Sequence, residues 1–139
     1  MYLLDTNVLS AIMSPVMPAP VDTWMAATPL HLLHTTSVSQ AEILAGIAIL
    51  PEGRRRRGLV EAAQAVFERN FAGTMLPFDS DAAEAYAEIF AERRRAGLHT
   101  KPTDLMIAAI ALSRDLSVVT RNVRDFEGCG VGVINPWDE

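Results

Sequence analysis

Acidic and amide side chains recur in this sequence at the ends of short apolar runs and near the starts of helical patterns. Asp5 directly follows an apolar run, Glu42 and Asp104 lie near the starts of two helical segments, and Asn122 and Asp125 follow another apolar run. Oxygen atoms of this kind are the ligands that hard cations such as Mg²⁺ and Mn²⁺ prefer. If the fold brings these residues together, they predict a site for a divalent metal ion.

Each of these residues also has a simpler explanation at the end of a helix. Asp5 could be an N-cap, Ser39–Glu42 has the form of a capping box, and Asp104 would stabilise a helix dipole. Asn122 with Asp125 resembles a cap and its helper. Capping explains acids at helix starts, but it gives no reason for several acids to share one place. A divalent cation does give that reason, because it offsets their mutual repulsion.

The elements predicted around these residues alternate between short apolar strands and helices. The strands are expected at 2–4, within 30–38, at 74–78 near a sheet edge, at 116–120 and at 131–134. The helices are expected from about 6 to 14, then at 21–27, 39–50, 58–71, 80–95 and 103–114, the last apolar all round and therefore buried. Such alternation predicts a mainly parallel sheet with helices on both faces. Strand C-terminal ends and helix N-terminal ends then share one edge, where ligands bind.

Length and composition predict one domain spanning residues 1–139, half of them apolar, with no run long enough to cross a membrane. The first residues lack the features of a signal peptide, and the lone Cys129 predicts a buried small residue in a cytoplasmic protein. The three histidines lack the spacing of a zinc site. The sequence also lacks a GxxxxGK[ST] phosphate-binding loop, a GxGxxG dinucleotide-binding loop and a GxSxG nucleophile elbow.

The net charge of −5 argues against a broad basic surface for nucleic acid, so any such contact must be local. Two arginine clusters, Arg54–Arg57 and Arg93–Arg95, either form solvated helix faces or contact phosphates. A further set of residues either belongs to the core or lines an apolar groove for a partner helix. Its members are Met13, Val16, Met17, Trp24 and Met25.

Four segments resemble the motifs of PIN-domain toxins of the VapC class, and the resemblance is closest to the FitB-like branch. They contain Asp5-Thr6-Asn7 after the first strand, Ser39–Gly46, Thr103–Ala109 and Val119–Phe126. The tail Val133–Trp137 is also similar to that of the family. Each motif alone is short, but the four occur in order and at the family's spacing over essentially the whole chain.

The resemblance implies a three-layer α/β/α sandwich around a central, mainly parallel sheet. It implies that Asp5, Glu42 and Asp104 are catalytic acids that bind Mg²⁺, or Mn²⁺ in its place, with Thr6 and Asn122 supporting the site. Many relatives have an aspartate where this chain has Asn122, and that departure puts a second metal ion in question unless Asp125 substitutes for it.

The family also implies the activity and the partners. The protein would be an endoribonuclease toxin of a type II toxin–antitoxin pair, a homodimer that cleaves RNA, with tRNA among the candidate substrates. A cognate antitoxin resembling VapB or FitA would inhibit it by inserting its C-terminal segment into the active-site groove.

Two other functions remain to be weighed. A phosphatase of the haloacid-dehalogenase type would use Asp5 as nucleophile, but that family has a second aspartate where this chain has Asn7. A PIN fold could also hold RNA or a partner without cutting. All three expected acids, Asp5, Glu42 and Asp104, are present, which argues against a PIN fold without catalytic activity.

Overall fold

The computed structural model describes residues 1–138, so the last residue of the predicted domain, Glu139, lies outside the described residues. Five strands form one parallel sheet in the order β3-β2-β1-β4-β5. The strands are β1 (Tyr2–Leu4), β2 (Leu33–Thr36), β3 (Met75–Leu76), β4 (Ser117–Val119) and β5 (Val133–Ile134). The prediction of a parallel sheet with the third strand at its edge is confirmed.

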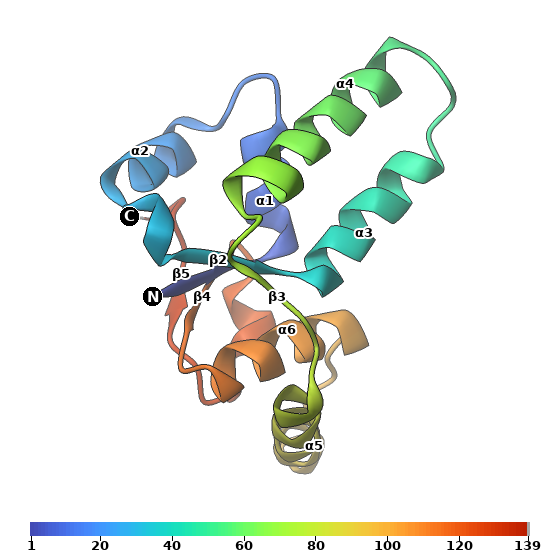
Figure 1. Cartoon of the computed structure of the whole chain (residues 1–139). Helices are drawn as coiled ribbons and strands as arrows, with labels where there is room; N and C mark the ends of the chain where they lie inside the picture. The colour runs from blue at the N-terminus through green and yellow to red at the C-terminus, as the bar shows by residue number, and fades with distance from the viewer. Residues whose placement is uncertain (139) are drawn as a thin grey trace.

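Six α-helices and three short irregular helices connect the strands (Figure 1). The α-helices are α1 (Thr6–Met13), α2 (Ala19–Ala27), α3 (Ser37–Ala48), α4 (Arg54–Gln64), α5 (Ser80–Arg95) and α6 (Pro102–Ser113). The others are 3₁₀ turns at Leu30–Leu32 and Val123–Phe126 and a π-helical segment at Ala65–Asn70. Among residues 1–138, no helix is long and apolar enough to cross a membrane.

Alternating side chains of the central strands bury two separate cores. Leu3 and Val118 belong to a core shared with α5 and α6, while Leu4 and Val119 belong to one shared with α1, α3 and α4. This follows from the period of two along a strand, which sends successive side chains to opposite faces. Figure 1 shows the result, with α5 and α6 on one side of the sheet and α1, α3 and α4 on the other. The predicted α/β/α sandwich is confirmed.

Of the two helices on this side of the sheet, α5 and α6, helix α6 is the more deeply buried. Its run Ile107–Ala111 has no exposed side chain, and Leu105 is almost fully covered. The sequence predicted this burial from a helix apolar on all sides. Because Asp104 lies in the first turn of α6, the packing of this helix fixes where that carboxylate emerges.

Three helices begin earlier than predicted, and α2 begins at Ala19 rather than residue 21. Helix α3 begins at Ser37, because the Thr36 side chain caps it by accepting from the Ser39 backbone N–H at 3.0 Å. Ser39 therefore lies inside the helix, and the predicted capping box with Glu42 does not form. Helix α4 begins at Arg54 rather than residue 58, since Arg is a good helix former and needs no apolar partner there.

The residues suggested as a partner groove near the first two helices mostly pack against the core. Met13 is buried, Trp24 and Met25 are half-buried, and the rings of Tyr2 and Trp24 meet edge to face at 5.4 Å. Val16 is 82% exposed. The core interpretation therefore holds for most of the set.

Burial predicts how stability responds to truncation of two isoleucines. Ile110 of α6 is fully buried, so Ile110→Ala should lower the free energy of unfolding by about 2–5 kcal/mol. Ile49, after α3, is 85% exposed, and Ile49→Ala should change it by less than about 0.5 kcal/mol. Urea unfolding of both variants checks the pair. Equal losses would contradict the assignment of α6 to the core.

Candidate active site

Asp5 lies at the carboxyl edge of the sheet between its two central strands, β1 and β4. Its backbone N–H donates to the Val119 carbonyl at 2.9 Å, and its side chain is 3% exposed. One carboxylate oxygen accepts from the Thr6 backbone N–H at 2.8 Å. The other accepts from the Thr120 hydroxyl at 2.8 Å and the Asn7 amide at 3.2 Å. Asp5 is thus the N-cap of α1, as the simpler explanation held. Its second oxygen, however, also accepts from Thr120, which directly follows β4.

Glu42 reaches the same edge from the second turn of α3. The Thr6 hydroxyl lies 2.8 Å from its Oε1 and 2.9 Å from the hydroxyl of the fully buried Ser39. Since a hydroxyl has one hydrogen, Thr6 can donate to the carboxylate while accepting from Ser39. This chain connects Asp5, through its neighbour Thr6, to the helix that carries Glu42.

Asp104 joins the site electrostatically from the first turn of α6. Burial, followed by the charges of Asp5 and Asp125, raises its pKa from 3.8 to about 6, while Lys101 opposes the rise and Glu42 adds to it. These contributions place the three other carboxylates close enough to repel Asp104. The fold therefore brings together four of the acids that the sequence singled out.

The pKa of Asp5 is also raised, mainly by burial. The hydrogen bonds from Thr120 and Thr6 oppose that rise, and the charges of Glu42 and Asp125 add to it. Hydrogen bonds to a carboxylate stabilise its charged form. The site therefore contains donors that favour the charged form of Asp5 and offset part of the effect of its burial.

Asn122 approaches the site through its backbone. Its N–H donates to the Thr120 hydroxyl oxygen at 3.0 Å, one hydrogen bond away from Asp5. Asp125 lies one turn further, in the 3₁₀ segment that begins at Val123. The structure thus brings Asp125 into the acidic cluster and places Asn122 beside it.

Three residues of the site were quoted within motifs but were not predicted to belong to it, and Ser39 was considered only as part of a capping box. Thr120 and Ser39 are fully buried hydroxyls, and Asn7 binds both Asp5 and Thr120 while its Oδ1 accepts from the Arg121 backbone N–H at 3.2 Å. A polar residue at the end of an apolar strand was the available signal for Thr120. Asn7 had its own signal, since it lies two residues after Asp5 and could turn back toward the strand end.

The chemistry of the donors suits Mg²⁺ or Mn²⁺, because the cluster offers carboxylate oxygens alone. Within residues 1–138, no three Asp, Glu, His or Cys side chains form a set that could hold a metal ion as they stand. Carboxylates repel one another when no cation lies between them, and this repulsion adds to burial in raising the pKa of Asp104. Binding a cation would therefore require these side chains to draw together.

A groove of about 270 Å³ opens beside the acids, between α1, α3 and α4. Thr6 and Glu42 line it, together with apolar side chains of the three helices, Gly46 and Arg55. Of the four acids, Glu42 lines the groove and Asp5, Asp104 and Asp125 do not.

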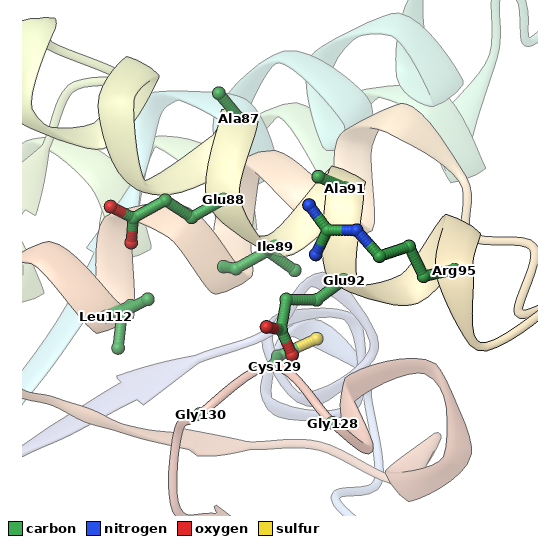
Figure 2. A pocket seen from close by; sticks show the side chains of 10 residues that line it. All are labelled: Ala87, Glu88, Ile89, Ala91, Glu92, Arg95, Leu112, Gly128, Cys129 and Gly130. Atoms are coloured by element: carbon green, nitrogen blue, oxygen red, sulfur yellow. The ribbon is translucent and has the colours of Figure 1, made fainter.

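A larger cavity, about 610 Å³, lies elsewhere, between α5, the end of α6 and the loop Gly128–Gly130 (Figure 2). Figure 2 shows Glu92 of α5 pointing toward the buried Cys129. None of the five predicted site residues lines this cavity. We therefore place the candidate active site at the acidic edge.

The second arginine cluster contributes to this region rather than to solvent alone. Arg93 is 4% exposed and donates to the Thr100 hydroxyl and the Glu127 carbonyl. Burial raises the pKa of the Cys129 thiol beside it, and Arg93 counteracts the rise. Arg93 thus fastens α5 to the loop before β5, a structural role that neither sequence interpretation of the cluster anticipated. Cys129 is a small buried residue, as predicted.

Like-charge repulsion predicts how the metal-free protein responds to Asp104→Asn. Because folding raises the pKa of Asp104 to about 6, the native state binds the extra proton, and stability should fall as the pH rises from 3.8 to 6. Asp104→Asn removes that loss. Relative to wild type, the melting temperature of the variant in EDTA should rise between pH 4 and pH 7.5.

Glu84→Gln provides the matched control, because Glu84 is exposed on α5 and takes no part in the cluster. Its melting temperature should track that of wild type across the same pH range. A difference between Asp104→Asn and wild type that shrinks with rising pH would contradict the crowding of charge at this edge.

Comparison with known proteins places the chain in a family. Residues 2–128 match the PIN domain. The chain is 41% identical over 138 residues to the plasmid stability protein StbB of Pseudomonas syringae pv. tomato, covering 99% of each chain. It is 33% identical to the VapC ribonuclease Y4jK of Sinorhizobium fredii, again over 99% of each chain.

Solved structures agree with the sequence relatives. The chain is 34% identical to the toxin FitB of Neisseria gonorrhoeae over the full length of both chains. It is similar to the crystal structure of FitAcB from that organism, with a TM-score of 0.92 and full coverage of both chains. A structure of FitAB bound to a DNA fragment gives a TM-score of 0.91, covering 99% of this chain and 96% of the other. This chain therefore belongs to the PIN domain family, among relatives named as VapC and FitB toxins.

Proposed function

We propose that this protein is an endoribonuclease, dependent on Mg²⁺ or Mn²⁺, that acts as the toxin of a VapBC-type pair. The observation that carries the proposal is the gathering of Asp5, Glu42, Asp104 and Asp125 at one edge of the sheet, where burial and then the charges of Asp5 and Asp125 raise the pKa of Asp104. The names of relatives matched over nearly the whole chain, a VapC ribonuclease and the toxin FitB, support the activity and the role.

The residues divide into ligands and the groups that hold them. Asp5, Glu42 and Asp104 would bind the cation, which supplies positive charge that lowers the pKa of water and offsets charge on the scissile phosphate. Thr120 and Asn7 fix the orientation of the Asp5 carboxylate. Thr6 does the same for Glu42 at 2.8 Å. Either Glu42 or Asp125 orients the attacking water.

The alternatives receive less support from the site. In the phosphatase alternative a second acid would follow Asp5, but Asn7 occupies that place and donates its amide to the Asp5 carboxylate. A non-catalytic module that binds RNA or a partner would have no use for hydrogen-bonded carboxyl groups gathered at one edge. The cleavage experiment below separates this alternative from the nuclease.

The proposed partners follow from the relatives and the chemistry. FitAB and FitAcB are the assemblies named in the two most similar structures reported above, so we propose a cognate antitoxin of the FitA or VapB kind. We also propose a homodimer that works in the cytoplasm on RNA, with tRNA the first substrate to test. Light scattering of the purified protein measures the oligomeric state.

Cleavage should depend on the cation and on the groups that hold Asp5. Purified protein with Mn²⁺ should cut tRNA or single-stranded RNA, excess EDTA should stop it, and Asp5→Asn should abolish it without changing the circular dichroism spectrum. Thr120→Val removes the hydroxyl 2.8 Å from Asp5 and should cost about 10–100-fold, as losses around metal ligands do.

Thr23→Val is the matched control, because Thr23 is exposed on α2 and its hydroxyl contacts only the Ala19 carbonyl of the same helix among the described residues. It should retain wild-type activity. Full activity of the wild type in EDTA would rule out the metal mechanism, and activity in Asp5→Asn would rule out this site.

Toxicity should depend on the same carboxylate. Expression of the wild-type chain alone should arrest growth of the host, and Asp5→Asn should not. Coexpression with the product of an adjacent reading frame that encodes a DNA-binding antitoxin should restore growth and yield a complex on purification. Harmless expression of an active nuclease would remove the toxin role and leave the enzyme.

A further inference from the structure

We propose that Arg121, stacked on the ring of Trp137, binds an RNA phosphate that flanks the scissile one. Neither residue lines the groove between α1, α3 and α4. This inference rests on the proposed nuclease function and gives its substrate two residues that the proposed mechanism does not use. The acids perform the chemistry, but their negative charge repels a polyanion, so RNA has to gain its attraction from a nearby cation.

The backbone of Arg121 is tied to the residues that hold Asp5. Arg121 directly follows Thr120, whose hydroxyl donates to the Asp5 carboxylate at 2.8 Å. The Arg121 backbone N–H donates to Oδ1 of Asn7 at 3.2 Å, and the amide of the same Asn7 donates to Asp5 at 3.2 Å. One side chain therefore sets the position of the Arg121 backbone relative to the carboxylate.

The guanidinium of Arg121 lies over the ring of Trp137, with 5.1 Å between its central carbon and the ring centroid. Trp137 is half-buried and packs against the core shared with α1, α3 and α4. Its backbone N–H donates to the side-chain oxygen of Asn135 at 3.0 Å, in the turn that directly follows β5. The ring is therefore a fixed support for the guanidinium.

Strand pairing aligns this support with the site. The Thr120 backbone N–H donates to the Ile134 carbonyl at 2.9 Å, so the residue that binds Asp5 also fixes the end of β5. Trp137 follows Ile134 by three residues. Arg121 is thus held at both ends, its backbone by Asn7 and its guanidinium by Trp137.

The guanidinium keeps its charge and its donors for a ligand. Arg121 is exposed, and within residues 1–138 it forms no salt bridge. Stacking occupies the flat face of a guanidinium, whereas its N–H groups lie in the plane and point outward. A phosphate can therefore accept bidentate hydrogen bonds from Arg121 without displacing Trp137.

A purely structural role does not account for this arrangement. An exposed cation–π contact adds little to stability, and Trp137 is already held by core packing and by its own turn. Asp125 and Asp138 lie near the two partners in the sequence, yet neither forms a salt bridge with Arg121. The fold thus holds a cation near an acidic edge without pairing it to an acid, as an anion-binding residue requires.

The sign of the charge favours RNA over a protein segment as the ligand of Arg121. A segment that neutralised the acids would carry cations, and Arg121 would repel them. An RNA strand can present one phosphate to a cation held by the acids and a neighbouring phosphate to Arg121. We therefore commit to an RNA phosphate and treat contact with the antitoxin as an outcome of the test.

The binding test compares Arg121→Gln with Arg94→Gln. Arg94 is exposed on α5, a helix on the opposite side of the sheet from the core that holds Trp137, and within residues 1–138 it forms no salt bridge. Both substitutions change the net charge equally. A difference between them therefore reports the position of the charge rather than its amount.

Binding is measured on an Asp5→Asn background, which leaves RNA intact. The fluorescence anisotropy of a labelled single-stranded oligoribonucleotide is followed with Mg²⁺ at several salt concentrations. Arg121→Gln should weaken binding about tenfold and reduce the slope of log K against log salt by about 0.7. Arg94→Gln should leave both close to those of the parent. A parent that binds no RNA would overturn the inference.

Substitutions of Trp137 test its role as a positioning residue. Trp137→Leu removes the aromatic face and should weaken RNA binding several-fold, while Trp137→Phe keeps a face and should restore most of the affinity. In the Arg121→Gln protein, Trp137→Leu should weaken binding no further, because the ring acts through the guanidinium. Equal losses from Trp137→Leu with and without Arg121 would overturn that role.

The kinetic test uses the same substitutions with Asp5 restored. Arg121→Gln should raise KM and leave kcat nearly unchanged, because contact with a flanking phosphate contributes equally to the ground and transition states. A wild type that cleaves no RNA overturns the proposed function, while Arg121-dependent binding would still support this inference.

Three results would overturn the assignment of Arg121 to RNA. Equal binding and kinetics in Arg121→Gln and Arg94→Gln would mean that Arg121 contributes only net charge. A lower melting temperature of Arg121→Gln with unchanged RNA binding would assign the pair to anchoring the chain after β5. Weaker capture of the coexpressed antitoxin, again with unchanged RNA binding, would assign it to a protein contact.

Discussion

The structure depends on how it holds a nearly buried carboxyl group where two central strands end. Asp5 is 3% exposed, and burial disfavours its charge. The fold offsets this with donors from three directions: the Thr6 backbone at the start of α1, the Asn7 amide and the Thr120 hydroxyl after β4. The alignment of β1 with β4 is therefore a requirement of the site as much as of the sheet.

Features that follow from the apolar pattern of the sequence could be predicted, whereas features that depend on where a neighbouring element ends could not. Strand β1 and the buried helix α6 follow from apolar pattern alone, and strand alternation placed Asp5, Glu42 and Asp104 at one edge. The start of α3 could not be predicted, because Thr36 and Ser39 are both good caps and only the end of β2 decides between them.

Tertiary contacts account for the remaining differences. Arg93 lies in a run of three arginines that looks like a solvated face, yet it is buried against the loop that carries Cys129. Nothing local distinguishes it from Arg94 or Arg95. Its hydrogen-bond partners Thr100 and Glu127 are brought to it by packing of α5 against α6, which pattern alone does not resolve.

Two residues that line the groove between α1, α3 and α4 depart from the usual residue preferences of helices. Gly46 interrupts a helix without a packing reason, and Arg55 belongs to a first helical turn made of cations. Departures of this kind in natural proteins are expected at functional sites, where stability is given up for activity.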